Sequence, residues 1–143
     1  MNLVEVRKFP DYDLFETDLK LVFGFLQRES NGENLSAYIK ENKTDFEDMS
    51  EDTYNVISIY SKSKKLLEKK EEFRTETGGI NMCKALEQIE ERGMERGIEL
   101  GIQNIIKACK NLDISMENAK KQIQILYSMV GDQAEAYIQK YWK

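Results

Sequence analysis

The spacing of hydrophobic and polar residues changes once along this chain, close to its only proline. Residues 1–9 alternate with a period of two, which is typical of a β-strand. After Pro10 the apolar residues recur at helical spacing instead. We therefore expect an all-α helical bundle preceded by a short extended segment at 1–10. A lone strand would lack a partner for its backbone groups, so this segment resembles the end of a larger sheet or a docked N-terminal arm.

Residues 11–77 are expected to form the N-terminal part of the bundle. An aspartate shortly after Pro10 is a suitable helix cap, and Ser50 is a suitable cap for a later helix. Asn31-Gly32 is typical of a loop. The apolar spacing predicts helices at 11–28, 34–42, 50–60 and 64–73. Gly78-Gly79 then marks the sharpest internal boundary.

Residues 79–112 contain no proline, and their only helix-weakening residues are isolated glycines. They predict one helix of about 30 residues, roughly 45 Å long at 1.5 Å per residue. Residues 113–143 predict a C-terminal helical hairpin, with helices from Ser115 to about Met129 and from Gln133 to Tyr141. All of these segments are expected to belong to a single domain.

A four-residue repeat lies inside the long helix, in the sequence ERGM-ERGI-ELGI of residues 91–102. A step of four places similar residues in four stripes, and their order around the helix is arginine, glycine, apolar, glutamate. Three glycines in a helix interior cost roughly 3 kcal/mol relative to alanine. Close approach of another backbone would compensate for this cost. The predicted helix–helix interface consists of Glu91, Arg92, Gly93, Met94, Glu95, Arg96, Gly97, Ile98, Glu99, Gly101 and Ile102.

The charged stripes favour an interface between two chains. Like charges four residues apart repel one another, and a second helix of opposite charge would relieve this repulsion. In a parallel two-fold pair, the arginine flank of one helix faces the glutamate flank of the other. We therefore expect a homo-oligomer, either a dimer or a larger assembly. Glycine packing within one chain and a hinge are the two alternatives.

Composition removes several classes of function. The chain has 143 residues, 21 Lys+Arg against 26 Asp+Glu, and no histidine. Histidine-based nucleophile pairs and zinc sites are therefore excluded, and no cofactor is expected. The net charge of −5 and the lack of a long basic run argue against direct DNA binding. No apolar run approaches the roughly 20 residues of a membrane span, and Cys83 and Cys109 lie in no redox motif, so we expect a cytoplasmic protein.

Four segments together resemble the C-terminal region of the PD-(D/E)XK nuclease family of putative transposases, also called recombination-promoting nucleases. They are DLKLVFGFLQ (18–27), DTYNVISIYSKSKKL (52–66), GGINMCKALEQIEERGMERGIELG (78–101) and AEAYIQKYW (134–142). The resemblance implies that full-length members carry a magnesium-dependent DNA endonuclease core upstream. It also implies that the period-two segment is the exit from the nuclease sheet.

That core is missing from this chain, so the resemblance implies no catalytic residue and no enzyme activity here. Two E-x-K strings, Glu41–Lys43 and Glu68–Lys70, fall in predicted helical segments rather than in a β-hairpin. The chain would be either a C-terminal domain or a short product with an internal start. It would then act as an oligomerisation module that could bind the full-length nuclease and inhibit it, as an antitoxin does.

Two further functions compete with this hypothesis. DNA binding could use the segment Ser115 to Tyr127 as a recognition helix, but it offers only Lys120 and Lys121 as cations. Core packing of Ile114, Ile123, Ile125 and Leu126 explains the same segment better. An independent enzyme would need a metal held by carboxylates alone, and no suitable carboxylate pair is evident.

Overall fold

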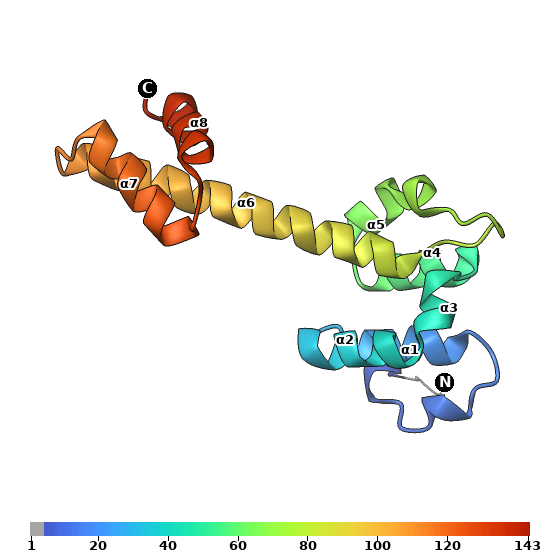
Figure 1. The fold of residues 1–143 in the computed structure, drawn as a ribbon. Coiled ribbons are helices and arrows are strands. Elements are labelled where there is room, and N and C mark those ends of the chain that lie inside the picture. Colours follow the sequence, from blue (N-terminus) through green and yellow to red (C-terminus); the bar gives the residue numbers. More distant parts are fainter. Residues whose placement is uncertain (1–4) are drawn as a thin grey trace. The chain divides into compact units, whose positions relative to one another are not determined.

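The computed structural model describes residues 5–143, and within them the regular elements are all helices (Figure 1). This confirms the predicted all-α fold. Residues 1–4 of the expected N-terminal strand lie outside the described part. Val6–Lys8 does not form a strand but one turn of 3-10 helix, flanked by extended backbone at Glu5 and Phe9. The side-chain amide of Gln27 donates hydrogen bonds to the carbonyls of Val6 and Phe9 at 3.1 and 2.8 Å, and so replaces a partner strand.

The contacts within the chain form two compact units, Met1–Ile89 and Glu90–Lys143. We call them unit 1 and unit 2. The boundary lies inside the longest helix, α6 (Met82–Asn111), whose 30 residues match the predicted length. One domain was expected from the sequence, but each unit has its own cluster of buried side chains.

Unit 1 is built from short helices and the first turns of α6. The predicted helix at 11–28 is divided into a 3-10 turn, Tyr12–Leu14, and α1. The Asn31 side chain caps α2 by accepting the Asn34 amide at 3.1 Å, and Ser50 caps α4 through the Thr53 amide at 3.3 Å. The α-helices of unit 1 before α6 are α1 (Leu19–Arg28), α2 (Gly32–Glu41), α3 (Lys43–Glu47), α4 (Glu51–Tyr60) and α5 (Lys64–Glu68).

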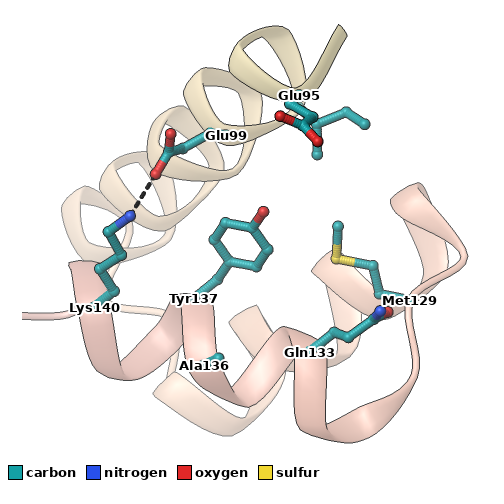
Figure 2. Close-up of a pocket in the computed structure, with 8 residues that line it drawn as sticks. Glu95, Glu99, Met129, Gln133, Ala136, Tyr137 and Lys140 are labelled. Carbon is teal, nitrogen blue, oxygen red and sulfur yellow. Dashed lines mark hydrogen bonds and ion pairs between the residues drawn. The ribbon is translucent and has the colours of Figure 1, made fainter. Parts of the chain in front are cut away.

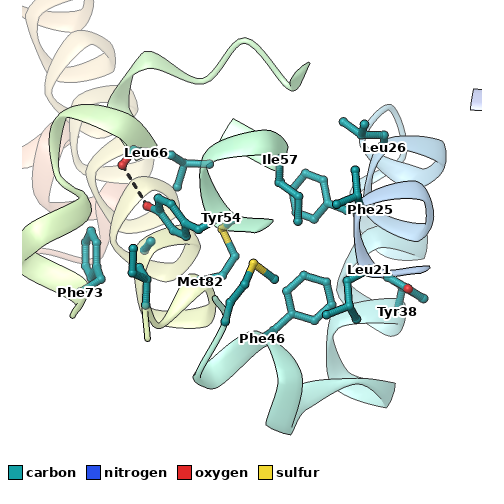
Figure 3. Packing of buried hydrophobic residues seen from close by; sticks show 14 of the residues in the cluster. Leu21, Phe25, Leu26, Tyr38, Phe46, Tyr54, Ile57, Leu66, Phe73 and Met82 are labelled. Atoms are coloured by element: carbon teal, nitrogen blue, oxygen red, sulfur yellow. Dashed lines mark hydrogen bonds between the residues drawn. The ribbon is translucent and has the colours of Figure 1, made fainter. Parts of the chain in front are cut away.

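The core of unit 1 combines aliphatic side chains with six buried aromatic rings (Figure 3). Phe46 has no exposed surface, and its ring lies 5.9 Å from that of Tyr38 and 6.3 Å from that of Phe25, between centroids. Tyr54 is also fully buried, and its hydroxyl donates to the Leu66 carbonyl at 2.9 Å. Among the described residues, every buried side-chain polar atom has a hydrogen-bond partner, as a close-packed core requires.

The segment between α5 and α6 is held by a short 3-10 turn, Lys70–Phe73, and by an isolated bridge between Met49 and Ile80. The Asp48 carboxylate accepts hydrogen bonds from the hydroxyls of Thr75 and Thr77, which lowers the pKa of Asp48. Gly78 has a φ of 90°, a conformation that side chains with a Cβ rarely adopt. The predicted boundary at Gly78-Gly79 is therefore a tight turn before α6.

Unit 2 contains the rest of α6, α7 (Met116–Tyr127) and α8 (Gly131–Tyr141). Both short helices lie against the C-terminal part of α6 (Figure 1). The Ser115 side chain caps α7 by accepting the Asn118 amide at 3.3 Å, as expected. The core is small and mostly aliphatic; its buried residues are Ile102, Ile106, Cys109, Ala119, Ile123, Ala134 and Ile138.

No helix in residues 5–143 combines the length and the apolar character needed to cross a membrane.

Candidate helix–helix interface

The predicted interface residues 91–102 all lie on α6 of unit 2, within an uninterrupted helix. The four stripes therefore exist as geometric features of the helix. Their burial changes along the helix, however, and divides the predicted interface into two parts.

The C-terminal part of the stripes packs within the chain. A Cβ atom added to Gly101 would lie 2.1 Å from the Tyr127 hydroxyl oxygen, so this glycine permits close contact between α6 and α7. Ile102 is fully buried, and Ile98 is half-buried against the same core. At Gly101, the cost of a helical glycine is therefore explained by packing inside one chain.

The N-terminal part of the stripes has no such packing. A Cβ atom added to Gly93 or Gly97 would have no heavy atom of residues 5–143 within 4 Å, apart from its own stretch of helix. Met94, on the neighbouring apolar stripe, is 62% exposed. All eight residues from Glu90 to Gly97 are exposed. The helix here has glycines that weaken it, and no packing in the described chain offsets their cost.

The flanking charges follow the same division. Glu91, Arg92, Glu95 and Arg96 are exposed, and none of them forms an ion pair with residues 5–143. Glu99, in contrast, accepts the Lys140 ammonium at 2.6 Å and the Tyr141 hydroxyl. The Lys140 hydrogen bond, followed by that from Tyr141, holds the pKa of Glu99 below its usual value.

A groove of about 570 Å³ in unit 2 lies beside the apolar stripe of α6 (Figure 2). Its apolar lining consists of Ile98, Met129, Ala136 and Tyr137. The Tyr137 ring points from α8 toward α6, and the Lys140–Glu99 ion pair closes one end (Figure 2). The remaining polar lining comes from Glu95 and Gln133.

Glu95, Ile98 and Glu99 are among the residues predicted from the sequence, but the side of the groove formed by α8 was not predicted. Gln133, Ala136, Tyr137 and Lys140 follow steps of three, one and three along α8, which places them on one face of that helix. This spacing was available in the sequence. Only the packing of α8 against α6 shows that the face lines a groove.

The carboxylates and cysteines considered in the sequence do not form a metal-binding or nucleophilic group in residues 5–143. The described chain contains no cluster of three or more Asp, Glu or Cys residues that could hold a metal ion. Glu41 is the last residue of α2 and Glu68 the last of α5, so neither E-x-K string lies in a hairpin. Cys109 is buried; Cys83 is half-buried, and burial raises the pKa of its thiol.

The proposed recognition segment, α7, is only partly used for packing. Ile123 is fully buried, but Ile125 and Leu126 are 71% and 61% exposed, so the expectation that they pack in the core is wrong. Ile125 lies about 200° around α7 from Ile123, on the side away from the core. Leu126 lies on the same face as Ala119 and Ile123, but in the last turn of α7, where it stays exposed. Lys120 is paired with Glu135 at 2.6 Å, which reduces its availability to a phosphate group.

Comparison of the chain with protein-family models, with curated proteins and with solved structures finds no match. The resemblance to the PD-(D/E)XK nuclease family therefore depends on the four sequence segments alone.

Proposed function

We propose that this chain is a non-catalytic oligomerisation module whose α6 helix associates with α6 of a second copy. The observation that carries the proposal is the open space beside Gly93 and Gly97. Glycines in an exposed helix cost about 1 kcal/mol each relative to alanine, and no contact with residues 5–143 offsets that cost here. A second helix could approach closely at this position and use the space.

The neighbouring residues supply attractive contacts for the same helix. Met94 is largely exposed, and full burial of a methionine side chain contributes about 1.5–3 kcal/mol. Arg92 and Arg96 on one flank, and Glu91 and Glu95 on the other, carry opposite charges without ion pairs in the described chain. Association would thus bury apolar surface and pair charges at the position where the backbones can come close.

Mass measurement in solution tests this proposal. We expect the wild-type chain to form a dimer or a larger assembly by light scattering or sedimentation, and Gly97→Leu to be monomeric at the same concentration. Lys107→Leu is the matched control, because Lys107 is exposed on α6 outside the glycine and apolar stripes. A wild-type chain that stays monomeric at high micromolar concentration would contradict the proposal.

The sequence resemblance extends the proposal to a second partner. A full-length PD-(D/E)XK nuclease that carries the same helix could form mixed assemblies with this chain, and the chain would then inhibit it in the manner of an antitoxin. The absence of a cysteine pair and the presence of two free thiols suit a reducing, cytoplasmic compartment. Co-expression tests the extension: unchanged nuclease toxicity without co-purification would disprove it.

A further inference from the structure

The groove of unit 2 opens on one flank of the candidate interface. Glu95 and Ile98 belong to the glutamate and apolar stripes, and both line the groove. Gly93, Gly97 and Met94 are the centre of the proposed contact, while the arginine stripe lies on the far side of the glycines. A helix seated on Gly93 and Gly97 would therefore have one of its own flanks directed at the groove.

The lining of the groove suits a long side chain that ends in a positive charge. Ile98, Met129 and Tyr137 offer apolar surface for an aliphatic stem and an aromatic ring for a guanidinium group. Glu99 is already engaged by Lys140 and Tyr141. Glu95 has no ion pair in residues 5–143, so the groove has one carboxylate available at its open end. Arginine combines an apolar stem with a planar group that matches a carboxylate.

Two-fold symmetry determines which residue of a second copy would place its cationic side chain in the groove. In a parallel two-fold pair, equal residues lie at equal heights, and the arginine flank of each helix faces the glutamate flank of its partner. Arg96 is one residue from Glu95, or about 1.5 Å along the helix axis. An antiparallel pair would instead bring the glutamates of the second copy toward Glu95 and Glu99.

We propose that the groove receives the Arg96 side chain from α6 of a second copy, and that this contact makes the pair parallel. The inference depends on the proposed function, because it requires the two α6 helices to associate. Two-fold symmetry makes the contact reciprocal, so each copy supplies one arginine and one groove.

A charge-exchanged variant, Glu95→Arg with Arg96→Glu, tests the orientation. Both side chains are exposed, and the exchange leaves the net charge unchanged. In a parallel pair, the variant still pairs with itself, but its mixed pair with the wild type sets arginine against arginine and glutamate against glutamate. We expect the mixed pair to be about tenfold weaker than either self-pair.

Native mass spectrometry of the variant mixed with isotope-labelled wild type measures the three pairs directly. Self-sorting of the two chains supports the parallel contact. Mixed pairs at or above the share given by random pairing would overturn it, because an antiparallel interface favours the mixed pair.

A substitution that fills the groove tests whether the groove binds the Arg96 side chain of the second copy. Ala136→Trp places a large ring in the groove at an exposed residue of α8, and we expect it to weaken association about tenfold. Gln139→Trp on the same helix is the control, since Gln139 is exposed and does not line the groove.

The outcomes separate the two proposals. If Gly97→Leu abolishes association but Ala136→Trp leaves it unchanged, the helix interface is supported and the proposed binding of Arg96 in the groove is overturned. If the wild type does not associate at all, both proposals fail.

Discussion

Unit 1 and unit 2 differ in how completely they bury their large apolar side chains. Unit 1 has a cluster of 15 buried residues, six of them aromatic, against five exposed large apolar side chains in its described part. Unit 2 has seven buried residues in its cluster and seven large apolar side chains that are exposed. Two of the buried residues of unit 2 are alanines, so its core is small as well as incomplete.

The difference indicates where a partner would be most useful. Exposed large apolar side chains beside a small core are surface that a partner could cover. Glycines show the same contrast. A Cβ atom added to Gly24 in unit 1 or to Gly101 in unit 2 would meet a tyrosine side chain, whereas one added to Gly93 or Gly97 would meet no heavy atom of residues 5–143 within 4 Å. Unit 2 therefore contains both the excess apolar surface and the open glycines.

The largest expected effect concerns the core of unit 1. Phe46→Ala removes a fully buried ring that contacts Tyr38 and Phe25, and it should lower the free energy of unfolding by about 3–5 kcal/mol. Urea denaturation measures this loss, with Phe46→Leu, which keeps a large apolar side chain and leaves a smaller cavity, as a milder control. A loss below about 1 kcal/mol would show that unit 1 is not the well-packed region described here.

The helices themselves could largely be predicted from the sequence because caps and apolar spacing are local signals. Ser50 and Ser115 cap helices as expected, and α6 has the expected length. Asn31 was expected in a loop but caps α2, whereas Asp11 makes no capping hydrogen bond through its side chain. The period-two pattern predicted a strand, and this prediction is wrong for Val6–Lys8 because alternation alone does not supply a partner strand. The side chain of Gln27, 18 or more residues away, satisfies the carbonyls of Val6 and Phe9 instead.

The candidate interface could be predicted only in part. The four stripes follow from the helix period, but the sequence does not show which glycines are covered. Tyr127 covers Gly101 because α7 folds back on α6, and this tertiary contact has no local signal. The α8 side of the groove was missed for the same reason.

Leucine at Gly101 and leucine at Gly93 should have opposite effects on stability, because only Gly101 is covered by another side chain. Gly101→Leu forces a side chain against Tyr127 and should destabilise the chain by about 1–3 kcal/mol, as overpacking does. Gly93→Leu, in open space, should instead stabilise the helix of an isolated chain by up to about 1 kcal/mol. Thermal unfolding of both variants at low protein concentration measures the difference.

Tyr127→Ala supplies the control for this comparison. If the cost of Gly101→Leu comes from the tyrosine, it should be smaller in the Tyr127→Ala background than in the wild type. Equal costs at Gly93 and Gly101 in the wild-type background would remove the distinction between the covered and the open glycines.

The smallest expected effect lies again in unit 1, where a buried hydroxyl completes the packing. Tyr54→Phe leaves the Leu66 carbonyl without its hydrogen bond and should cost about 1–2 kcal/mol. Tyr60→Phe is the matched control on the same helix, because Tyr60 is 61% exposed, and we expect no measurable change. Urea denaturation at neutral pH distinguishes the two variants.

The same tyrosine gives unit 1 a dependence on alkaline pH. Burial raises the pKa of Tyr54 from 10.0 to about 12 in the folded chain, so the folded state holds the proton more tightly than the unfolded state. The resulting stability is fully present below pH 10 and is lost as the pH rises from 10 to about 12. Tyr38 contributes in the same direction, since burial also raises its pKa to about 12. Tyr54→Phe should therefore flatten the fall in stability over this range without abolishing it, and an unchanged slope would show that Tyr54 ionises as readily in the folded chain as in the unfolded one.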